Sequence, residues 1–404
     1  MNIKKFDKNK IIFKKFRIIK NISNGSFGAV HLGENIITKE PVAIKIEPKK
    51  TSKQKTLEKE AYYLYILKGF GIPRVISYGY CGSYNILVEE LLGKSLYVLN
   101  KTNKFTLKDI CMIGIQVLSR LEYIHSKNII HCDIKPENLL IGKTDPSTIY
   151  LCDFGISQKY RSSKTGKHIK MKKYPKIYVS PIFCSINSIL AYQPSRRDDL
   201  ESLGYLLIYL VKGLPWDIRN CYNNNLNESL KKLLYIKRNI SMETLCKELP
   251  MEIYEYMRNV KNLKFEEKPN YTYLNNLFYS ILVKLNEECD NNFSWNKNIK
   301  KRLILKNKSY ILKDIVESRN KNLQFKEISN IIQRRNYSET NIKSLFSNNL
   351  KNKNENNISN RNNAQNVIDF WTKLAEQNKN NSTNNDNDLE VENNLFINYK
   401  KLSF

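Results

Sequence analysis

The chain has 404 residues, of which 41% are hydrophobic and 26% are charged, and this balance excludes both a wholly disordered polyelectrolyte and a fibrous repeat. Lys and Arg number 67 against 39 Asp and Glu, and the net charge of +28 favours an anionic partner, whether nucleic acid, a membrane surface or an acidic or phosphorylated protein. The eight cysteines include no Cys-x-x-Cys pair, and the richest apolar run, 203–211, is far shorter than the ~20 residues that a membrane span requires. We therefore expect reduced thiols, no structural zinc and no membrane span.

The first predicted elements are strands joined by a turn that contains glycine. Alternating apolar and polar residues predict strands over 16–23 and 29–33, and the turn between them contains Gly25 and Gly28. Such a turn lets backbone N–H groups approach a phosphate, although the turn by itself favours a plain hairpin. A third strand, 42–47, carries Lys45 near its end, one strand after the turn. The turn and Lys45 together favour a phosphate-binding turn with the lysine beneath it.

The next segment, 51–67, has the apolar spacing of a helix and carries a carboxylate on its apolar face. Leu57, Leu64 and Leu67 share that face with Glu60, so Glu60 is predicted to point inward. A buried carboxylate needs a partner, and Lys45 is the candidate. The alternative is a partly exposed glutamate on a surface helix.

A further helix and an unusually informative loop follow. Thr106 and Asp109 form a capping-box pattern that opens a helix running to about residue 125. The stretch 130–140 then contains Asp133 and Asn138, and an apolar strand, 149–152, ends in Asp153-Phe154-Gly155. Asp-Phe-Gly alone occurs by chance in many proteins. Asp133, Asn138 and Asp153 occur in this order, downstream of a lysine, an inward glutamate and a turn that contains glycine. A coincidence of all these features is implausible.

These residues together resemble the protein kinase domain, and further motifs resemble the casein kinase I family in particular. The motifs are Gly71-Ile72-Pro73, Glu90-Leu91-Leu92-Gly93-Lys94-Ser95-Leu96, Ser185-Ile186-Asn187 in place of the usual Ala-Pro-Glu, Ser195-Arg196-Arg197-Asp198-Asp199-Leu200-Glu201, Leu214-Pro215-Trp216 and Lys268-Pro269-Asn270-Tyr271. The resemblance covers residues 11–297. It implies an α+β, two-lobed protein kinase fold, with a small β-rich N-lobe over about 11–92 and a large, mostly helical C-lobe over about 93–297.

The resemblance also implies an activity and a set of roles, namely a serine/threonine kinase that uses ATP and Mg²⁺. Asp133 would accept the hydrogen of a substrate hydroxyl and Lys135 would neutralise charge on the transferred group. Lys45, held by Glu60, would bind the ATP phosphates. Asp153 would ligate magnesium, with Asn138 on a second ion. Asp199 is predicted to anchor the catalytic loop. The other residues that the resemblance places around the nucleotide are Ser23, Gly25, Ser26, Phe27, Gly28, Val30, Ala43, Glu89, Glu90, Leu92, Leu140 and Cys152.

Four positions depart from the family pattern, although none removes a group that the chemistry requires. Ser23 replaces the first glycine of the glycine-rich loop, and Cys132 replaces the arginine of His-Arg-Asp. Glu89 stands at the gatekeeper position, where the family has an apolar residue. Ile182 stands where the family has an arginine that binds a phosphate already on the substrate. Glu89 would be costly to bury at the back of the adenine pocket unless it pairs with Lys45, in competition with Glu60, or takes up a proton.

Two stretches of the sequence have an unusual charge or polar composition. Between Lys159 and Lys176 there are eight Lys or Arg and no Asp or Glu, which predicts attraction of acidic substrates, although a solvated flexible loop is the alternative. Between Asn348 and Asn394, 18 of 47 residues are Asn. We therefore expect 298–404 to be a basic, then Asn-rich low-complexity tail that is mostly disordered.

The resemblance and the charge leave two other classes open. One is a catalytically weak scaffold of the pseudokinase type, and the other is a basic, nucleic-acid-associated protein. Against them we expect a monomer that acts on acidic or phosphorylated protein substrates, without a specific nucleic acid partner. Its expected location is the cytoplasm, the nucleus or both.

Overall fold

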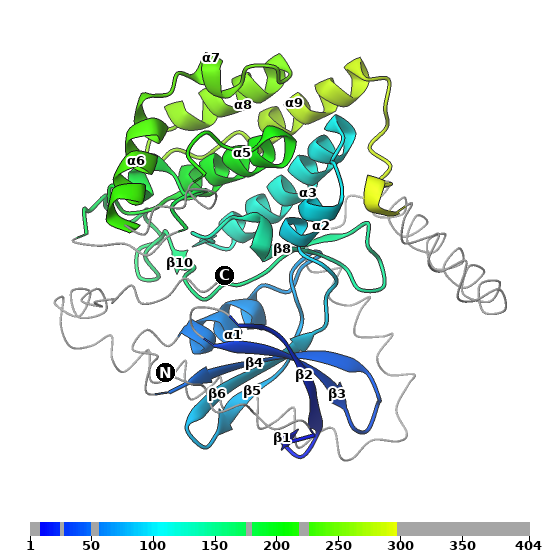
Figure 1. Ribbon diagram of the computed structural model, residues 1–404. Coiled ribbons are helices and arrows are strands. Elements are labelled where there is room, and N and C mark those ends of the chain that lie inside the picture. The colour runs from blue at the N-terminus through cyan, green and yellow to red at the C-terminus, as the bar shows by residue number, and fades with distance from the viewer. Residues whose placement is uncertain (1–8, 25–27, 50–55, 175–179, 218–225, 297–404) are drawn as a thin grey trace, which may run out of the picture. The chain divides into compact units, whose positions relative to one another are not determined.

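The computed structural model describes residues 9–24, 28–49, 56–174, 180–217 and 226–296 (Figure 1). The first part of the chain forms one six-stranded sheet in which every pair of neighbours is antiparallel. Its strands, in spatial order, are β1 (Ile11–Ile12), β2 (Phe16–Asn24), β3 (Ala29–Asn35), β4 (Pro41–Pro48), β6 (Tyr84–Glu90) and β5 (Val75–Cys81). The strands predicted at 16–23, 29–33 and 42–47 are confirmed with small changes at their ends.

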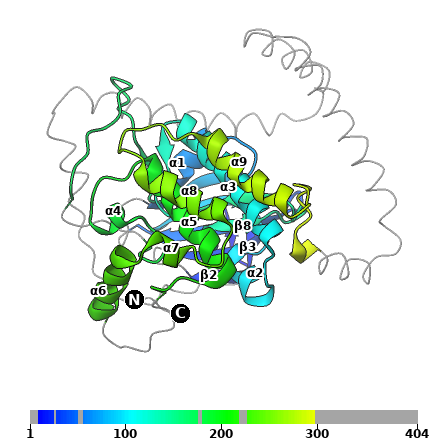
Figure 2. The ribbon, with the colours of Figure 1, turned by 90° about the horizontal axis from the view of Figure 1, so that it is seen from above.

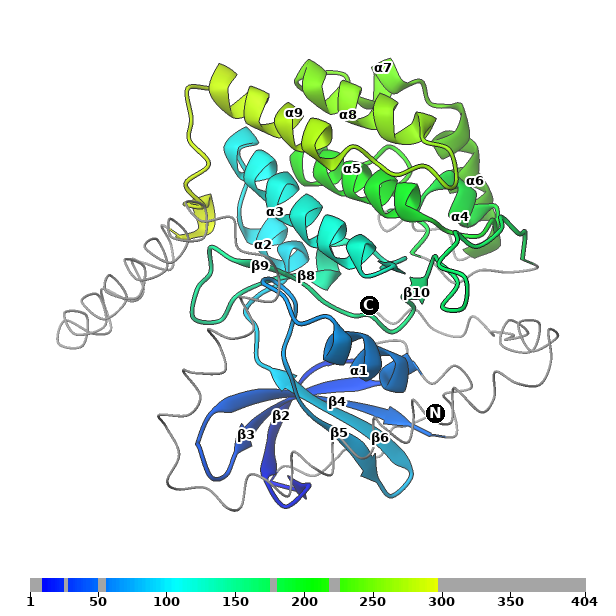
Figure 3. The same cartoon turned by 180° about the vertical axis from the view of Figure 1, so that it is seen from behind.

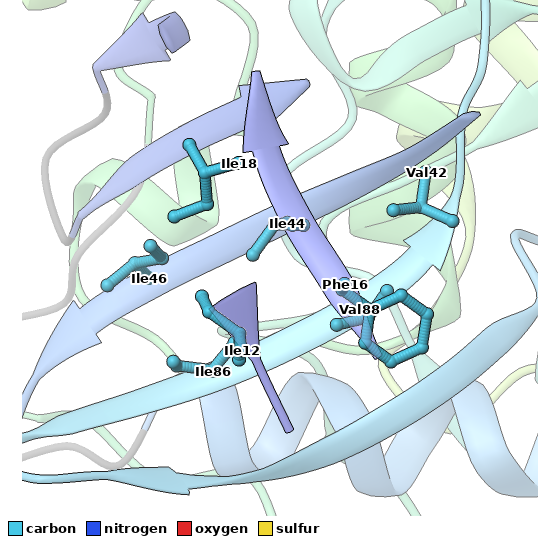
Figure 4. Packing of buried hydrophobic residues seen from close by; sticks show 8 residues of the cluster. All are labelled: Ile12, Phe16, Ile18, Val42, Ile44, Ile46, Ile86 and Val88. Carbon is cyan, nitrogen blue, oxygen red and sulfur yellow. The ribbon is translucent and has the colours of Figure 1, made fainter. Parts of the chain in front are cut away.

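The two faces of this sheet carry different side chains because successive residues of a strand point to opposite sides. One face holds the hydrophobic core of the N-lobe, shown in Figure 4, which consists of Ile12, Phe16, Ile18, Val42, Ile44, Ile46, Ile86 and Val88. Each fully buried side chain of this kind stabilises the fold by about 1.5–3 kcal/mol. The residues that alternate with them in β4 and β6 therefore point to the opposite face, and they include Lys45 and Glu89.

Helix α1 (Thr56–Ile66) packs against β5 and β6, as Figure 3 shows. The helix predicted over 51–67 is confirmed for its described part, and 51–55 lie outside the described residues. Leu57, Glu60 and Leu64 are all buried, so the inward orientation predicted for Glu60 is confirmed.

The C-lobe consists mainly of helices, and α3, α5, α8 and α9 pack side by side (Figures 1 and 2). Its helices are α2 (Leu96–Thr102), α3 (Leu107–Ser126), α4 (Ile186–Ile189), α5 (Arg196–Lys212), α6 (Leu226–Asn239), α7 (Met242–Leu245), α8 (Met251–Asn262) and α9 (Tyr271–Lys284). The short elements are the 3-10 turn η1 (Pro136–Asn138) and the strands β7 (Ile129–Ile130), β8 (Leu139–Ile141), β9 (Ile149–Leu151) and β10 (Gln158–Lys159).

One central helix of the C-lobe confirms a specific sequence prediction, and another is notable for its burial. The Thr106 hydroxyl accepts a hydrogen bond from Asp109 N, and the Asp109 carboxylate accepts one from Thr106 N, which completes the predicted capping box of α3. Helix α5 is buried on nearly all sides, and every residue from Asp198 to Ile208 is buried. At Gly204 a Cβ would lie 2.1 Å from Met257 Sδ, so glycine allows the close approach of α5 and α8.

The fold is therefore a β-rich N-lobe followed by a helical C-lobe, as the sequence predicts. None of the helices in the described ranges is long and apolar enough to cross a membrane. The predicted tail, 298–404, lies outside the described residues.

Candidate active site

Sheet register brings one lysine and two carboxylates together on the helix-facing side of the N-lobe sheet. In the β4–β6 pair, Ala43 is opposite Glu89, and Lys45 is two residues further along β4. Lys45 Nζ lies 2.6 Å from Glu60 Oε1 of α1 and 3.0 Å from Glu89 Oε1. The predicted pairing of Lys45 with Glu60 is therefore present, and Glu89 shares the same ammonium group.

The charges around Lys45 do not balance. Burial lowers the pKa of Lys45, but the carboxylates of Glu60, Glu89 and Asp153 outweigh burial and hold that pKa well above its usual value. Burial raises the pKa of Glu60, Lys45 opposes the rise, and Asp153 and Glu89 add to it. The second oxygen of Glu89, Oε2, is buried without a hydrogen-bond partner among the described residues. Three carboxylates thus act on a single lysine.

We expect Glu89→Gln to increase ATP affinity, because ATP is an anion and Glu89 adds a negative charge beside the lysine that would bind it. Removing one unfavourable interaction between partly buried charges is worth on the order of 1 kcal/mol, or about fivefold in affinity. The pKa of Glu60 should also fall, since Glu89 raises it. ATP titration of the parent, Glu89→Gln and the apolar Glu89→Met measures the change.

Glu40→Gln is the matched control, since Glu40 is an exposed carboxylate just before β4 of the same sheet. Its ATP affinity should match that of the parent. Unchanged or weaker binding by both Glu89 variants would contradict the interpretation and would mean that Glu89 does not oppose ATP.

A second cluster lies in the loop between β7 and β8, around Asp133. Lys135 Nζ donates to Asp133 Oδ2 at 2.6 Å, and Asn138 Nδ2 donates to the same oxygen at 3.0 Å. Ser180 Oγ donates to Asp133 Oδ1 at 2.6 Å and accepts a bond from Lys135 Nζ at 3.1 Å. Burial alone would raise the pKa of Asp133, but Lys135 and Ser180 outweigh it and lower the pKa. Asp133 is therefore ionised at neutral pH.

Buried hydrogen bonds fix the backbone of this loop. Asp199, near the start of α5, accepts from His131 N at 2.7 Å, Cys132 N at 2.8 Å and His125 Nε2 at 2.9 Å. The predicted anchoring role of Asp199 agrees with these contacts. His131 is fully buried, and its Nδ1 accepts from Asp133 N at 3.2 Å. Cys132 has a φ of 70°, a left-handed conformation, and its own N–H is one of the two backbone donors to Asp199.

Asp153 and Asn138 provide oxygen atoms of the kind that Mg²⁺ prefers. Asn138 donates both of its bonds to Asp133 from Nδ2, which leaves Oδ1 as its atom for a cation. The Asp153 charge acts on both Lys45 and Lys135, because it raises the pKa of each against the effect of burial. Within the described ranges no cluster of three or more His, Cys, Asp or Glu is placed to hold a metal. Two oxygen donors fit Mg²⁺, which in nucleotide sites takes much of its coordination from phosphates and water.

The other predicted nucleotide residues fall on the sheet and on the segments next to it. Ser23 and Val30 are opposite each other at the ends of β2 and β3, and Ala43 is in the middle of β4. A Cβ at Gly28 would lie 2.2 Å from Ile46 O, so only glycine fits there. Gly25, Ser26 and Phe27 lie outside the described residues.

The chain between the lobes is held to β8. Gly93 N donates to Ile141 O at 2.8 Å, which places Leu92 beside the strand that carries Leu140. Glu90 Oε1 accepts from Arg74 N at 2.7 Å. Cys152 is buried, and its N–H donates to Asn138 O at 2.9 Å. These contacts connect the predicted nucleotide residues with the loop that carries Asp133 and Asn138.

Sequence reasoning missed two residues of this region, Ser180 and Lys237. Ser180 contacts both Asp133 and Lys135, and Lys237 on α6 is buried against the segment that follows Ser180. Ser180 lies in no periodic pattern, and Lys237 continues the apolar stripe of α6 one turn after the buried Leu233, where a lysine is not predicted to be buried. The only signal was the position of Ser180 shortly before Ser185-Ile186-Asn187.

A comparison with known protein families agrees with this geometry. The family model of the protein kinase domain matches residues 16–279, which is well over half of the chain. This match implies that the protein uses ATP and acts on protein substrates. The domain boundaries predicted at residues 11 and 297 and the individual site roles stay predictions. On the match and on the arrangement of lysines and carboxylates, the chain belongs to the protein kinase family.

Proposed function

We propose that this protein kinase transfers the γ-phosphate of ATP, with Mg²⁺, to serine and threonine residues of acidic proteins, in the manner of the casein kinase I family. The observation that carries the proposal is the contact of Ser180 Oγ with Asp133 Oδ1 at 2.6 Å, beside Lys135. It supports an acceptor of the serine or threonine type because an aliphatic hydroxyl of the chain itself already fits against this carboxylate.

Each residue of the site has a role in this reaction. Asp133 orients the acceptor hydroxyl and takes its proton, while Lys135 offsets the charge of the transferred group. Lys45 binds the phosphates of ATP, and Glu60 holds Lys45 in place. Asn138 and Asp153 would hold magnesium, which when bound supplies further positive charge at the phosphates. Positioned cations matter most because the transition state spreads negative charge over the phosphoryl oxygens.

The preference for acidic substrates rests on the basic segment, residues 159–174 of the described chain. Seven cations of this segment are exposed, and they are Lys159, Arg161, Lys164, Lys167, Lys170, Lys172 and Lys173. The eighth cation of the prediction, Lys176, lies outside the described residues. At one end, β10 pairs with β7 directly before the catalytic loop. The segment therefore begins beside the strand that leads into the loop of Asp133, where its positive field would act on an approaching substrate.

A dedicated site for a single substrate phosphate has little support. Ile182, which stands in place of an arginine, is buried and provides no cationic donor. Lys231 and Lys232 on α6 are exposed, so neither is held in a fixed anion pocket. Attraction should therefore be diffuse, with only a modest gain from a phosphate at one fixed position.

A peptide panel at two salt concentrations tests the proposal. It compares Ser, Thr and Tyr acceptors in acidic, phosphate-primed and neutral contexts. We expect transfer to Ser and Thr, faster in acidic contexts, with an advantage that shrinks as salt rises, because the Debye length falls from about 10 Å at 0.1 M to about 3 Å at 1 M. Transfer to Tyr alone would contradict the acceptor class. A strong and salt-resistant dependence on one primed phosphate would contradict the diffuse attraction.

Two further features of the proposal follow from the resemblance alone. They are a monomeric state and a location in the cytoplasm, the nucleus or both. The pseudokinase and nucleic-acid alternatives gain no specific support from the described residues.

A further inference from the structure

A buried lysine of α6 holds the segment that follows Ser180. Lys237 Nζ donates to the carbonyl oxygens of Pro181 at 3.2 Å, Ile182 at 3.0 Å and Cys184 at 2.5 Å. An ammonium group has three N–H bonds, so these acceptors use all of them. Lys237 is only 1% exposed. It reaches a segment that lies more than fifty residues earlier in the chain.

The surroundings of Lys237 show that it is held as a cation by carbonyls and aromatic rings. Its Nζ lies 4.4 Å from the ring centroid of Tyr205 and 5.1 Å from that of Trp216. None of the ion pairs among the described residues includes it. Burial lowers the pKa of Lys237 to about 8, so the group is still largely charged at neutral pH. A buried charge is costly, and its three acceptors all belong to one short segment.

That segment connects directly to the catalytic carboxylate. Ser180, which precedes Pro181, donates to Asp133 Oδ1 and accepts from Lys135 Nζ. Trp216 Nε1 also donates to Ile182 O, at 2.8 Å, so one carbonyl is held from two sides. Asp133 and Lys135 therefore contact Ser180, at the start of the segment, and Lys237 binds the carbonyl groups of the residues that follow.

We propose that Lys237 is a positioning residue for the phosphoryl acceptor: it fixes residues 181–184 so that Ser180 orients Asp133 and the acceptor peptide docks beside them. This inference rests on the proposed function. It assigns Lys237 to the acceptor side of the reaction, because no contact of Lys237 involves Lys45, Glu60 or the other described residues of the nucleotide site.

Lys237→Met tests the inference, since it keeps the length of the side chain and removes the three donors. We expect kcat/KM for an acidic serine peptide to fall at least tenfold, as the loss of one hydrogen bond from a charged group corresponds to about tenfold to a hundredfold. ATP affinity, measured by direct titration, should change by less than about twofold, since the nucleotide side keeps its contacts. Amide hydrogen exchange over 180–187 should become faster than in the parent.

Two further variants sharpen the result. Lys212→Met is the matched control, because Lys212 is an exposed lysine that donates to the carbonyl of Lys247 at 2.6 Å, away from the catalytic loop. It should leave kcat/KM and the exchange of 180–187 unchanged. Trp216→Phe removes the indole donor to Ile182 O and keeps a ring, so it should cause a smaller fall in kcat/KM in the same direction.

The outcomes separate this inference from the proposed function. If the parent protein phosphorylates no peptide at all, the proposed function fails, and hydrogen exchange still tests whether Lys237 holds the segment. An active parent with unchanged kcat/KM in Lys237→Met would overturn the inference. So would loss of ATP affinity as large as the loss in kcat/KM. If Lys237→Met does not fold, Trp216→Phe decides, and unchanged kcat/KM and exchange in that variant would count against the inference.

Discussion

Asp133→Asn should lower turnover by about 10²–10⁴-fold, the usual contribution of a positioned general base. The amide keeps the shape of the side chain and one acceptor oxygen, but it cannot take a proton and no longer offers a negative charge to Lys135. ATP affinity should stay close to that of the parent, because Asp133 contacts the acceptor hydroxyl in the proposed reaction. Steady-state kinetics with an acidic serine peptide, together with ATP titration, measures both effects.

Asp290→Asn is the control for the same chemical change at a distance. Asp290 pairs with Lys108 in the C-lobe, and its side chain is 38% exposed. Its variant should have the turnover of the parent. If Asp133→Asn turns over as fast as Asp290→Asn, Asp133 is not the catalytic base.

Asp199→Asn should lower turnover on the order of 10²-fold, because a displacement of about 1 Å in a catalytic group can have an effect of that size. The amide leaves only one acceptor oxygen where the carboxylate accepts from His131 N, Cys132 N and His125 Nε2. A buried N–H without an acceptor costs about 1–3 kcal/mol, so the free energy of unfolding should fall by a similar amount. Denaturant unfolding and peptide kinetics on the same preparation measure both quantities.

A second variant distinguishes the loss of the Asp199 anchor from a general loss of stability. Asp198 is also buried near the start of α5, but it accepts from Ser195 N and Ser185 Oγ, away from the catalytic loop. Asp198→Asn should therefore lower the free energy of unfolding with a much smaller loss of turnover. Equal losses of turnover in the two variants would show that Asp199 has no special connection to the catalytic loop.

The sequence predicts well those features that depend on neighbouring residues or on one face of a helix. The capping box of α3 is such a feature, since Thr106 and Asp109 are three residues apart. The inward orientation of Glu60 is another, because it shares a helical face with buried leucines. The order of Asp133, Asn138 and Asp153 is itself a motif, so their region could be recognised before their contacts were known.

The remaining features depend on pairing between distant segments. Glu89 meets Lys45 because β4 and β6 pair in one register, and a shift of either strand by one residue would turn its own side chain to the other face and separate the two. Ser180 reaches Asp133 across 47 residues, and Lys237 reaches Ile182 across 55. Strands such as β7 and β10 have only two residues each, too few for an alternating pattern. Local periodicity carries no information about such contacts.

Radiolabelled ATP and casein, with the intact chain and its Asp153→Asn variant compared in the presence of Mg²⁺, test phosphoryl transfer most directly. Acid hydrolysis of the labelled casein then identifies the modified residue. The account predicts label on phosphoserine and phosphothreonine with the intact chain, and a loss of rate of several powers of ten in the variant, since each tenfold corresponds to about 1.4 kcal/mol of transition-state stabilisation. Equal labelling by the two proteins, or label on phosphotyrosine alone, would contradict it.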